Sequence, residues 1–296
     1  MINKQLFVLG IWFLMSHTPL FADLKNINDK RISELENVNV RVIFIRHGFS
    51  CGNVLEASHK TAASYPDPEL TSLGVDLSKA NGEKLKEELA KRNIVVDFIG
   101  SSSLIRAIET AYYLFGDEKN IYPLPFVAEK YNTLDNTPLP PKQQRNVISN
   151  DDCIPCLDEN TCPIKFKPFY DAQVRGKSNI EEFNNWLADN LDNILSKSKQ
   201  WHPINDGIFT MAIVTHRNFI YRELGFKDVP NNSVFENILL FKREEGKWQF
   251  IGDKHDKYQK IDYEISLPEE APNYNVIVKT LGQDRCRIDV RTKSCP

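Results

Sequence analysis

The sequence has little net charge and no long hydrophobic run. Its 296 residues hold 37 Lys and Arg against 40 Asp and Glu, a formal net charge of −3. This near balance excludes a general electrostatic attraction to nucleic acid, so a local cluster of cations must draw any anionic substrate. The apolar run from Leu6 to Met15 is short for a membrane span, which needs about 20 residues.

A zinc site would lack its fourth ligand. Cys153, Cys156 and Cys162 offer three soft ligands, but no His or further Cys lies near them in the sequence. Disulfides are therefore the favoured interpretation of the six cysteines, and zinc is the alternative. Six cysteines can pair in 15 ways, and the sequence does not choose among them. The full set is Cys51, Cys153, Cys156, Cys162, Cys286 and Cys295.

Two of these cysteine positions carry further expectations. Cys286 and Cys295 are expected to fasten the C-terminus, to each other or to cysteines of the central region. Cys51 lies close behind His47 and is a candidate nucleophile, although a disulfide or a buried thiol is the favoured interpretation.

Residues 1–22 have the pattern of a signal peptide. Lys4 supplies a positive end, the apolar run follows, and Leu20-Phe21-Ala22 offers a cleavage site before Asp23. We expect a secreted, periplasmic or secretory-lumen protein with no stable membrane insertion after cleavage. An uncleaved anchor is the alternative. Disulfides agree with an oxidising compartment.

The rest of the chain alternates strand and helix patterns, which predicts the α/β class. Apolar residues make up 41% and charged residues 26% of the sequence, as in ordinary soluble globular proteins. Strands are expected at 40–45, 94–99, 121–127 and 209–214, with a hairpin at 237–243 and 247–251. Helices are expected at 75–89 with Thr71 or Ser72 as N-cap, at 104–111, at 179–199 and at 219–224.

Cations and imidazoles follow the expected strands at their carboxyl ends. Arg46-His47-Gly48 comes after the first strand, and His216 follows the strand at 209–214. Ligands of open α/β sheets bind at this edge. Arg106 lies near a helix start, where free N–H groups attract anions, although a solvated surface cation is the alternative. One His after a strand is more often structural, but two such strand ends in one chain indicate a site.

Five motifs together resemble the phosphoglycerate mutase-like histidine phosphatases. The first is Arg46-His47-Gly48, with Asn53 where that family places a phosphate-contacting Asn. The others are Leu-Thr-x-Leu-Gly at 70–74, Ser-x-Leu-x-Arg-Ala-x-Glu-Thr-Ala at 102–111, Glu129 in Val-Ala-Glu-Lys-Tyr, and His216. The resemblance covers roughly residues 40–130 and 209–224.

The resemblance implies a three-layer α/β/α sandwich around a mostly parallel sheet and a two-step phosphatase without metal or cofactor. His47 would form a phosphohistidine, and Glu129 would be the proton donor, with a surface Glu as the competing interpretation. Arg46, Asn53, Arg106 and His216 would bind the phosphate. The substrate would be a small-molecule or peptide phosphomonoester, with no nucleic acid partner. A non-catalytic phosphate- or phosphopeptide-binding module and a phosphomutase are the rival hypotheses.

Residues 23–296 are expected to form one domain with two additions. Residues 132–178 break the α/β order and carry three of the cysteines, so they form an insertion or cap, and residues 262–296 form a C-terminal extension. The insertion either selects substrate or is a surface excursion tied by disulfides. Phe49, where many relatives have Glu, and the insertion, which is not part of the common core, leave the substrate open. Arg217, where relatives often have Gly, either adds a cation to the site or points into solvent. His59 is expected to be an exposed loop residue. The oligomeric state is not predicted.

Overall fold

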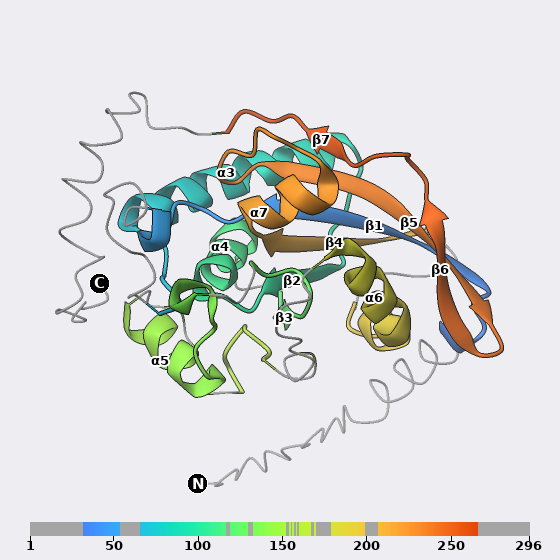
Figure 1. Ribbon diagram of the computed structural model, residues 1–296, viewed down its shortest axis with the longest axis horizontal. Coiled ribbons are helices and arrows are strands. Elements are labelled where there is room, and N and C mark those ends of the chain that lie inside the picture. The colour runs from blue at the N-terminus through green and yellow to red at the C-terminus, as the bar shows by residue number, and fades with distance from the viewer. Residues whose placement is uncertain are drawn as a thin grey trace, which may run out of the picture.

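The computed structural model describes residues 32–53, 66–116, 119–129, 133–151, 154, 156, 158, 160–166, 169, 179–198 and 207–265. The expected leader, the chain beyond residue 265 and His59 lie outside these ranges. The described strands form one mixed sheet, and helices cover both of its faces (Figure 1). The three-layer α/β/α arrangement is therefore confirmed. Within the described ranges, no helix has both the length and the apolar character needed to cross a membrane.

Four neighbouring strands of the sheet are parallel. In spatial order they are β3 (Ile121–Leu124), β2 (Phe98–Ser102), β4 (Ile208–Thr215) and β1 (Asn37–Arg46). The continuous Val, Ile and Phe runs of β1 and β4 suit strands that are buried on both faces. Because all four strands point the same way, their carboxyl ends meet at one edge of the sheet.

The other part of the sheet is antiparallel. β5 (Val234–Glu244) pairs with β1 and forms a hairpin with β6 (Lys247–Asp253), as predicted. The short strand β7 (Gln259–Ile261) also pairs with β5 and was not predicted, because three residues are too few to show a period.

Alternate residues of β1 pack against opposite helical layers. Val42 and Phe44 share a buried cluster with α6 (Ile180–Leu195), while Ile43 and Ile45 share another with α3 (Ser72–Lys91) and α4 (Ile105–Phe115). This follows from the two-residue period of a strand. Burying each such side chain contributes roughly 1.5–3 kcal/mol to folding.

Side-chain caps fix where the long helices begin. The hydroxyl of Thr71 accepts a hydrogen bond from the N–H of Gly74 at 2.9 Å, which confirms Thr71 as the N-cap of α3. Asn179 caps α6 in the same way, by accepting from Glu182 N at 2.8 Å. The remaining helical elements are η2 (Leu134–Asn136), α5 (Pro141–Asp151), α7 (Arg217–Phe219) and the π-helical turn η4 (Ile220–Leu224). Gly225, with a φ of 81°, ends η4 as expected.

Several strand boundaries differ from the prediction, and the differences at β2 and β3 have clear causes. β2 begins at Phe98, not Ile94, and runs through Gly100-Ser101-Ser102, whose backbone pairs with β3 although their side chains are not apolar. β3 ends at Leu124, not Val127, because Pro125 has no N–H to donate and Phe126 has a φ of 64°. β3 is the end strand of the ordered path and so lies at an edge of the sheet, where prolines are tolerated.

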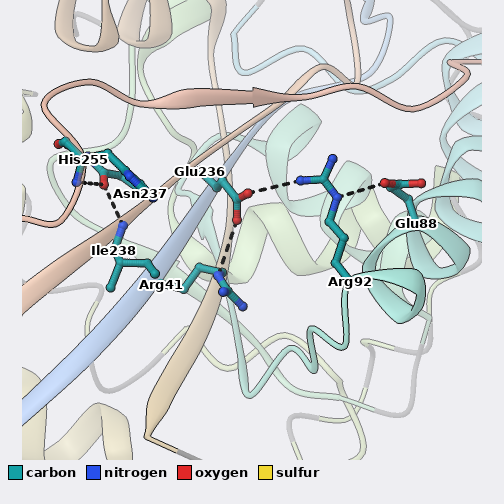
Figure 2. A network of polar contacts seen from close by, with 7 residues as sticks. All are labelled: Arg41, Glu88, Arg92, Glu236, Asn237, Ile238 and His255. Atoms are coloured by element: carbon teal, nitrogen blue, oxygen red, sulfur yellow. Dashed lines mark hydrogen bonds and ion pairs between the residues drawn. The ribbon is translucent and has the colours of Figure 1, made fainter.

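An ion-pair network ties the end of α3 to the sheet (Figure 2). The Nη1 of Arg92 lies 3.3 Å from Oε1 of Glu236, and the Nε of Arg41 lies 3.4 Å from Oε2 of the same carboxylate. Arg92 also donates to Glu88 on α3 at 2.9 Å, a hydrogen bond that lowers the pKa of Glu88. One carboxylate on β5 therefore holds two cations, one from β1 and one from the residue after α3.

Candidate active site

The two histidines lie at the ends of neighbouring parallel strands. Arg46 of β1 is paired in register with Thr215 of β4, and His47 and His216 are the next residues of the two strands. The backbone N–H of His47 donates to the carbonyl of Thr215 at 2.9 Å. The ring centroids of His47 and His216 are 5.0 Å apart, with the ring planes inclined by 60°. The structure therefore brings both imidazoles to one place, as the sequence predicted.

Two guanidinium groups act on this pair of imidazoles. Arg106 is the second residue of α4, just beyond β2, and its side chain is buried. Burial lowers the pKa of His47 well below 6.5, and the charges of Arg106 and Arg46 lower it further. Burial also lowers the pKa of His216, followed by Arg106, His47 and Arg46. Both imidazoles are therefore neutral at pH 7 and face the same cations.

The hydrogen bond of His47 selects its tautomer. The Nδ1 of His47 lies 2.7 Å from the carbonyl oxygen of Gly48, which can only accept, so Nδ1 carries the proton. The lone pair of the ring is then on Nε2. A neutral imidazole with Nε2 unprotonated is the form that can attack an electrophile.

His216 is buried, and its ring makes no hydrogen bond within the described part of the chain. Its exposed fraction is 0%, and neither Nδ1 nor Nε2 has a hydrogen-bond partner among the described residues. Burying a polar group in this way is costly unless a partner arrives. A ligand oxygen beside His47 would supply that partner.

Gly48 leaves room for the backbone to approach the helices. A Cβ at this position would lie 2.5 Å from the hydroxyl of Ser78 on α3. The N–H of Gly48 donates to the hydroxyl of Thr110 at 2.9 Å, and that hydroxyl donates to the carbonyl of Arg106 at 2.7 Å. The residue after His47 is thereby linked to the turn of α4 that carries Arg106.

Arg46 is held beside the start of β5. Its Nη1 donates to the carbonyl of Val229 at 2.5 Å, and its backbone pairs with Asn232 and Ser233. Asn53 makes its described contacts with Ser50, whose N–H and hydroxyl both donate to Oδ1 of Asn53 at 3.1 Å. A contact of Asn53 with phosphate stays a prediction.

Glu129 is buried and is held by a residue from the His216 segment. Its exposed fraction is 8%, so the interpretation as a surface Glu is wrong. Asn218 donates to both carboxylate oxygens, from Nδ2 at 2.8 Å and from its backbone N–H at 3.4 Å. Glu129, which follows β3, is thus fixed to the segment that begins with His216. Its role as proton donor stays a prediction.

The structure also bears on the expectations for the cysteines and for Arg217. Cys51 is disulfide-bonded, which rules it out as a free nucleophile, and Cys156 pairs with Cys162 in a disulfide, so these two are not zinc ligands. Arg217 is exposed. Cys153, Cys286 and Cys295 lie outside the described residues.

Sequence reasoning missed two polar residues that hold the site together. One is Asn218, the partner of Glu129, and it could have been noticed as a short polar residue two positions after His216. The other is Asp67, which is buried and binds the first turn of α4. Asp67-Pro68 before the Leu-Thr motif signals only a turn, so its long-range contacts were not visible in the sequence.

No family model matches this chain, and no curated protein matches it. Solved structures do match. The ecdysone phosphate phosphatase of Bombyx mori, in complex with tungstate, has 12% identity and a TM-score of 0.43, covering 72% of this chain and 92% of that chain.

Two further matches are enzymes by their names. A phosphoglycerate mutase from Bacillus anthracis has 16% identity and a TM-score of 0.38, covering 73% of this chain and 92% of that chain. A phosphoserine phosphatase from Entamoeba histolytica, in complex with 3-phosphoglyceric acid, has 18% identity and a TM-score of 0.31, covering 72% of this chain and 96% of that chain.

Proposed function

We propose that this protein is a histidine phosphatase that hydrolyses a phosphomonoester through a phosphohistidine on His47. One observation carries the proposal: two neutral, buried imidazoles with centroids 5.0 Å apart share their surroundings with the guanidinium groups of Arg46 and Arg106. Neutral imidazole supplies a nucleophile, and guanidinium forks match phosphate oxygens. The sequence motifs that resemble histidine phosphatases support the same assignment.

The first step transfers the phosphoryl group to the enzyme. Nε2 of His47 attacks phosphorus in line, the N–P bond forms, and the bond from phosphorus to the ester oxygen breaks. Glu129 donates its proton to the departing alcohol. Arg46 and Arg106 neutralise the charge on the non-bridging oxygens, and a ring nitrogen of His216 gains the partner that it lacks among the described residues.

The second step returns the enzyme to its starting state. Water attacks phosphorus, the Glu129 carboxylate accepts a proton from this water, and the N–P bond breaks to release phosphate. Asn218 serves both steps because its two donors keep the Glu129 oxygens in one orientation while the proton leaves and returns.

The test uses residues 23–296 and para-nitrophenyl phosphate. We expect hydrolysis by the parent protein, none by His47→Ala, and an acid-labile, alkali-stable phosphate on His47 after rapid quenching. His255→Ala is the matched control, because His255 lies in the loop after β6 and pairs with Asn237 (Figure 2). Full activity of His47→Ala would end the proposal. Phosphate binding by the parent protein without any turnover would identify a phosphate-binding module instead.

We also propose that the chain is exported and cleaved after Ala22. The leader pattern supports this, and so do the disulfides at Cys51 and between Cys156 and Cys162, which suit an oxidising compartment. N-terminal sequencing of the protein from its native source should begin at Asp23. A start at Met1 would support an uncleaved anchor.

A further inference from the structure

The segment 133–151 contacts the guanidinium of Arg106 directly. Nη1 of Arg106 donates to the carbonyl of Asp135 at 2.9 Å, and Nη2 donates to Oδ1 of Asn136 at 2.7 Å. The amide of Asn136 is oriented in turn, because its Nδ2 donates to the hydroxyl of Thr133 at 2.9 Å. Two acceptors on two terminal nitrogens define the plane of a guanidinium group. The turn η2 therefore sets the direction in which the fork of Arg106 points.

Asp67 fastens the same segment to the first turn of α4. Its Oδ1 accepts from the N–H of Ile105 at 2.8 Å, immediately before Arg106. Its Oδ2 accepts from the N–H of Leu139 at 2.9 Å and from Nε2 of Gln144 on α5 at 2.6 Å. The carboxylate of Asp67 thus joins its own loop to the start of α4 and to segment 133–151, which are far apart in the sequence.

The surroundings of Asp67 are unusual for a residue with only a packing role. The side chain is 1% exposed, and its backbone has a φ of 48°, which few residues adopt. Burial raises the pKa of Asp67 from 3.8 to about 6, while the three donors and the charge of Arg106 act in the opposite direction. The carboxylate is therefore ionised at pH 7 although it is buried, and its charge lies within the field of Arg106.

We propose that Asp67 and Asn136 are positioning residues, through which the segment 133–151 holds Arg106 in the orientation that binds the phosphate group. The inference rests on the proposed function and deepens it. The proposal makes segment 133–151 part of the site. The sequence alone left two alternatives for the expected insertion, namely that it selects substrate or that it is a surface excursion. Neither residue touches the reacting atoms, and both act through Arg106.

The experiment measures the affinity for inorganic phosphate by calorimetry, together with the melting temperature. We expect Asp67→Asn to weaken phosphate binding by about tenfold, the effect of losing a charge-assisted hydrogen bond. Asp97→Asn is the matched control, since its carboxylate also accepts a backbone N–H, from Thr210 at 2.8 Å, but at the amino end of β4. This control should lower the melting temperature and leave phosphate affinity unchanged.

A double-mutant cycle tests whether Asp67 acts through Arg106. In an Arg106→Ala background, Asp67→Asn should cause no further loss of phosphate affinity, because the group that it positions is gone. The KM for para-nitrophenyl phosphate should rise with the phosphate dissociation constant, while kcat per folded molecule changes less. Additive losses in the cycle would overturn the proposal, and so would wild-type affinity in Asp67→Asn.

Asn136→Ala provides a second route if Asp67→Asn does not fold. It removes the side-chain acceptor of Arg106 and leaves Asp67 in place, so it should weaken phosphate binding and spare the melting temperature. Unchanged affinity in this variant would also overturn the proposal. A parent protein that neither binds phosphate nor hydrolyses the ester would refute the proposed function itself. Failure of the positioning proposal would instead leave the parent protein active and the variants unaffected.

Discussion

Replacing Gly74 with alanine should damage the site from within a helix. Gly74 lies in the first turn of α3, against the loop that follows His47. A Cβ there would overlap the carbonyl oxygen of Phe49 and lie 2.9 Å from its carbonyl carbon. The obstacle is backbone, so no side-chain rotation relieves it. The same carbonyl accepts hydrogen bonds from the N–H of Thr71 at 3.0 Å and from its hydroxyl at 3.1 Å.

The cost can be worked from these contacts. Overpacking costs about 1–3 kcal/mol, and each lost hydrogen bond to the Phe49 carbonyl adds about 1 kcal/mol. Alanine regains about 1 kcal/mol of helix propensity over glycine. The free energy of unfolding should therefore fall by about 2–4 kcal/mol. A shift of about 1 Å in the residues beside His47 can lower a rate by about a hundredfold, so we expect a loss of that order in kcat/KM.

Gly82→Ala is the matched control on the same helix. A Cβ at Gly82 would lie 2.6 Å from the carbonyl oxygen of Leu114, near the end of α4 that is remote from Arg106. Urea unfolding should show a comparable loss of stability for both variants. Hydrolysis of para-nitrophenyl phosphate, measured where both remain folded, should fall only for Gly74→Ala. Equal kcat/KM values in the two variants would refute the claim that Gly74 positions the loop.

Three further predictions concern pH, the ion-pair network and a disulfide. Because the pKa values of His47 and His216 are lowered in the folded state, protons bind the unfolded chain first as pH falls, and these two histidines should lower the free energy of unfolding by about 2 kcal/mol between pH 6.5 and 5.5. Asp67, whose pKa is raised to about 6 in the folded state, takes up its proton in the same range and offsets part of this drop. Chemical denaturation should show this drop reduced in a His47→Asn, His216→Asn double variant, and an unchanged drop would contradict the assignment. Glu236→Gln removes the partner of two arginines (Figure 2), and should cost at most about 1 kcal/mol in thermal unfolding with hydrolysis unaffected. Replacing Cys156 and Cys162 with serine removes a disulfide that closes a loop with a sequence separation of 6. Denaturant unfolding should show a loss of about 2 kcal/mol in the free energy of unfolding, and reducing agent should cause no further loss through this pair of residues.

The sequence predicted that His47 and His216 come together, because both follow apolar strand patterns. The apolar runs before Arg46 and before His216 are short and rich in β-branched residues, which favours buried strands, and parallel strands bring their carboxyl ends together. The register of Arg46 with Thr215 then follows from burying Ile43 and Ile45 on one face and Phe44 on the other. Local pattern thus placed both histidines at strand ends, the motif resemblance placed them in one site, and the structure shows that β1 and β4 are neighbours.

Positions fixed by polar contacts were not predictable in this way. Gly100-Ser101-Ser102 has no strand pattern, yet β2 continues through it because β3 and β4 satisfy its backbone on both sides. Asp67 lies 38 residues from Ile105 and 72 from Leu139 in the sequence, and nothing in the residues between them indicates that one carboxylate joins both. Such contacts depend on the tertiary structure, so the secondary-structure propensities of local segments do not reveal them.

His47 and Arg106, the proposed nucleophile and the proposed phosphate-binding cation, depend on different parts of the fold for their positions. The loop after His47 is fixed by α3 through Thr71, and by α4 through Thr110. The guanidinium of Arg106 is fixed by the turn η2. α4 takes part in both, because its first turn carries Arg106 and its Thr110 accepts a hydrogen bond from Gly48. A perturbation of segment 133–151 should therefore impair phosphate binding before it disturbs His47. A perturbation of the first turns of α4, between Arg106 and Thr110, should impair both, because Thr110 links the loop after His47 to the turn that carries Arg106.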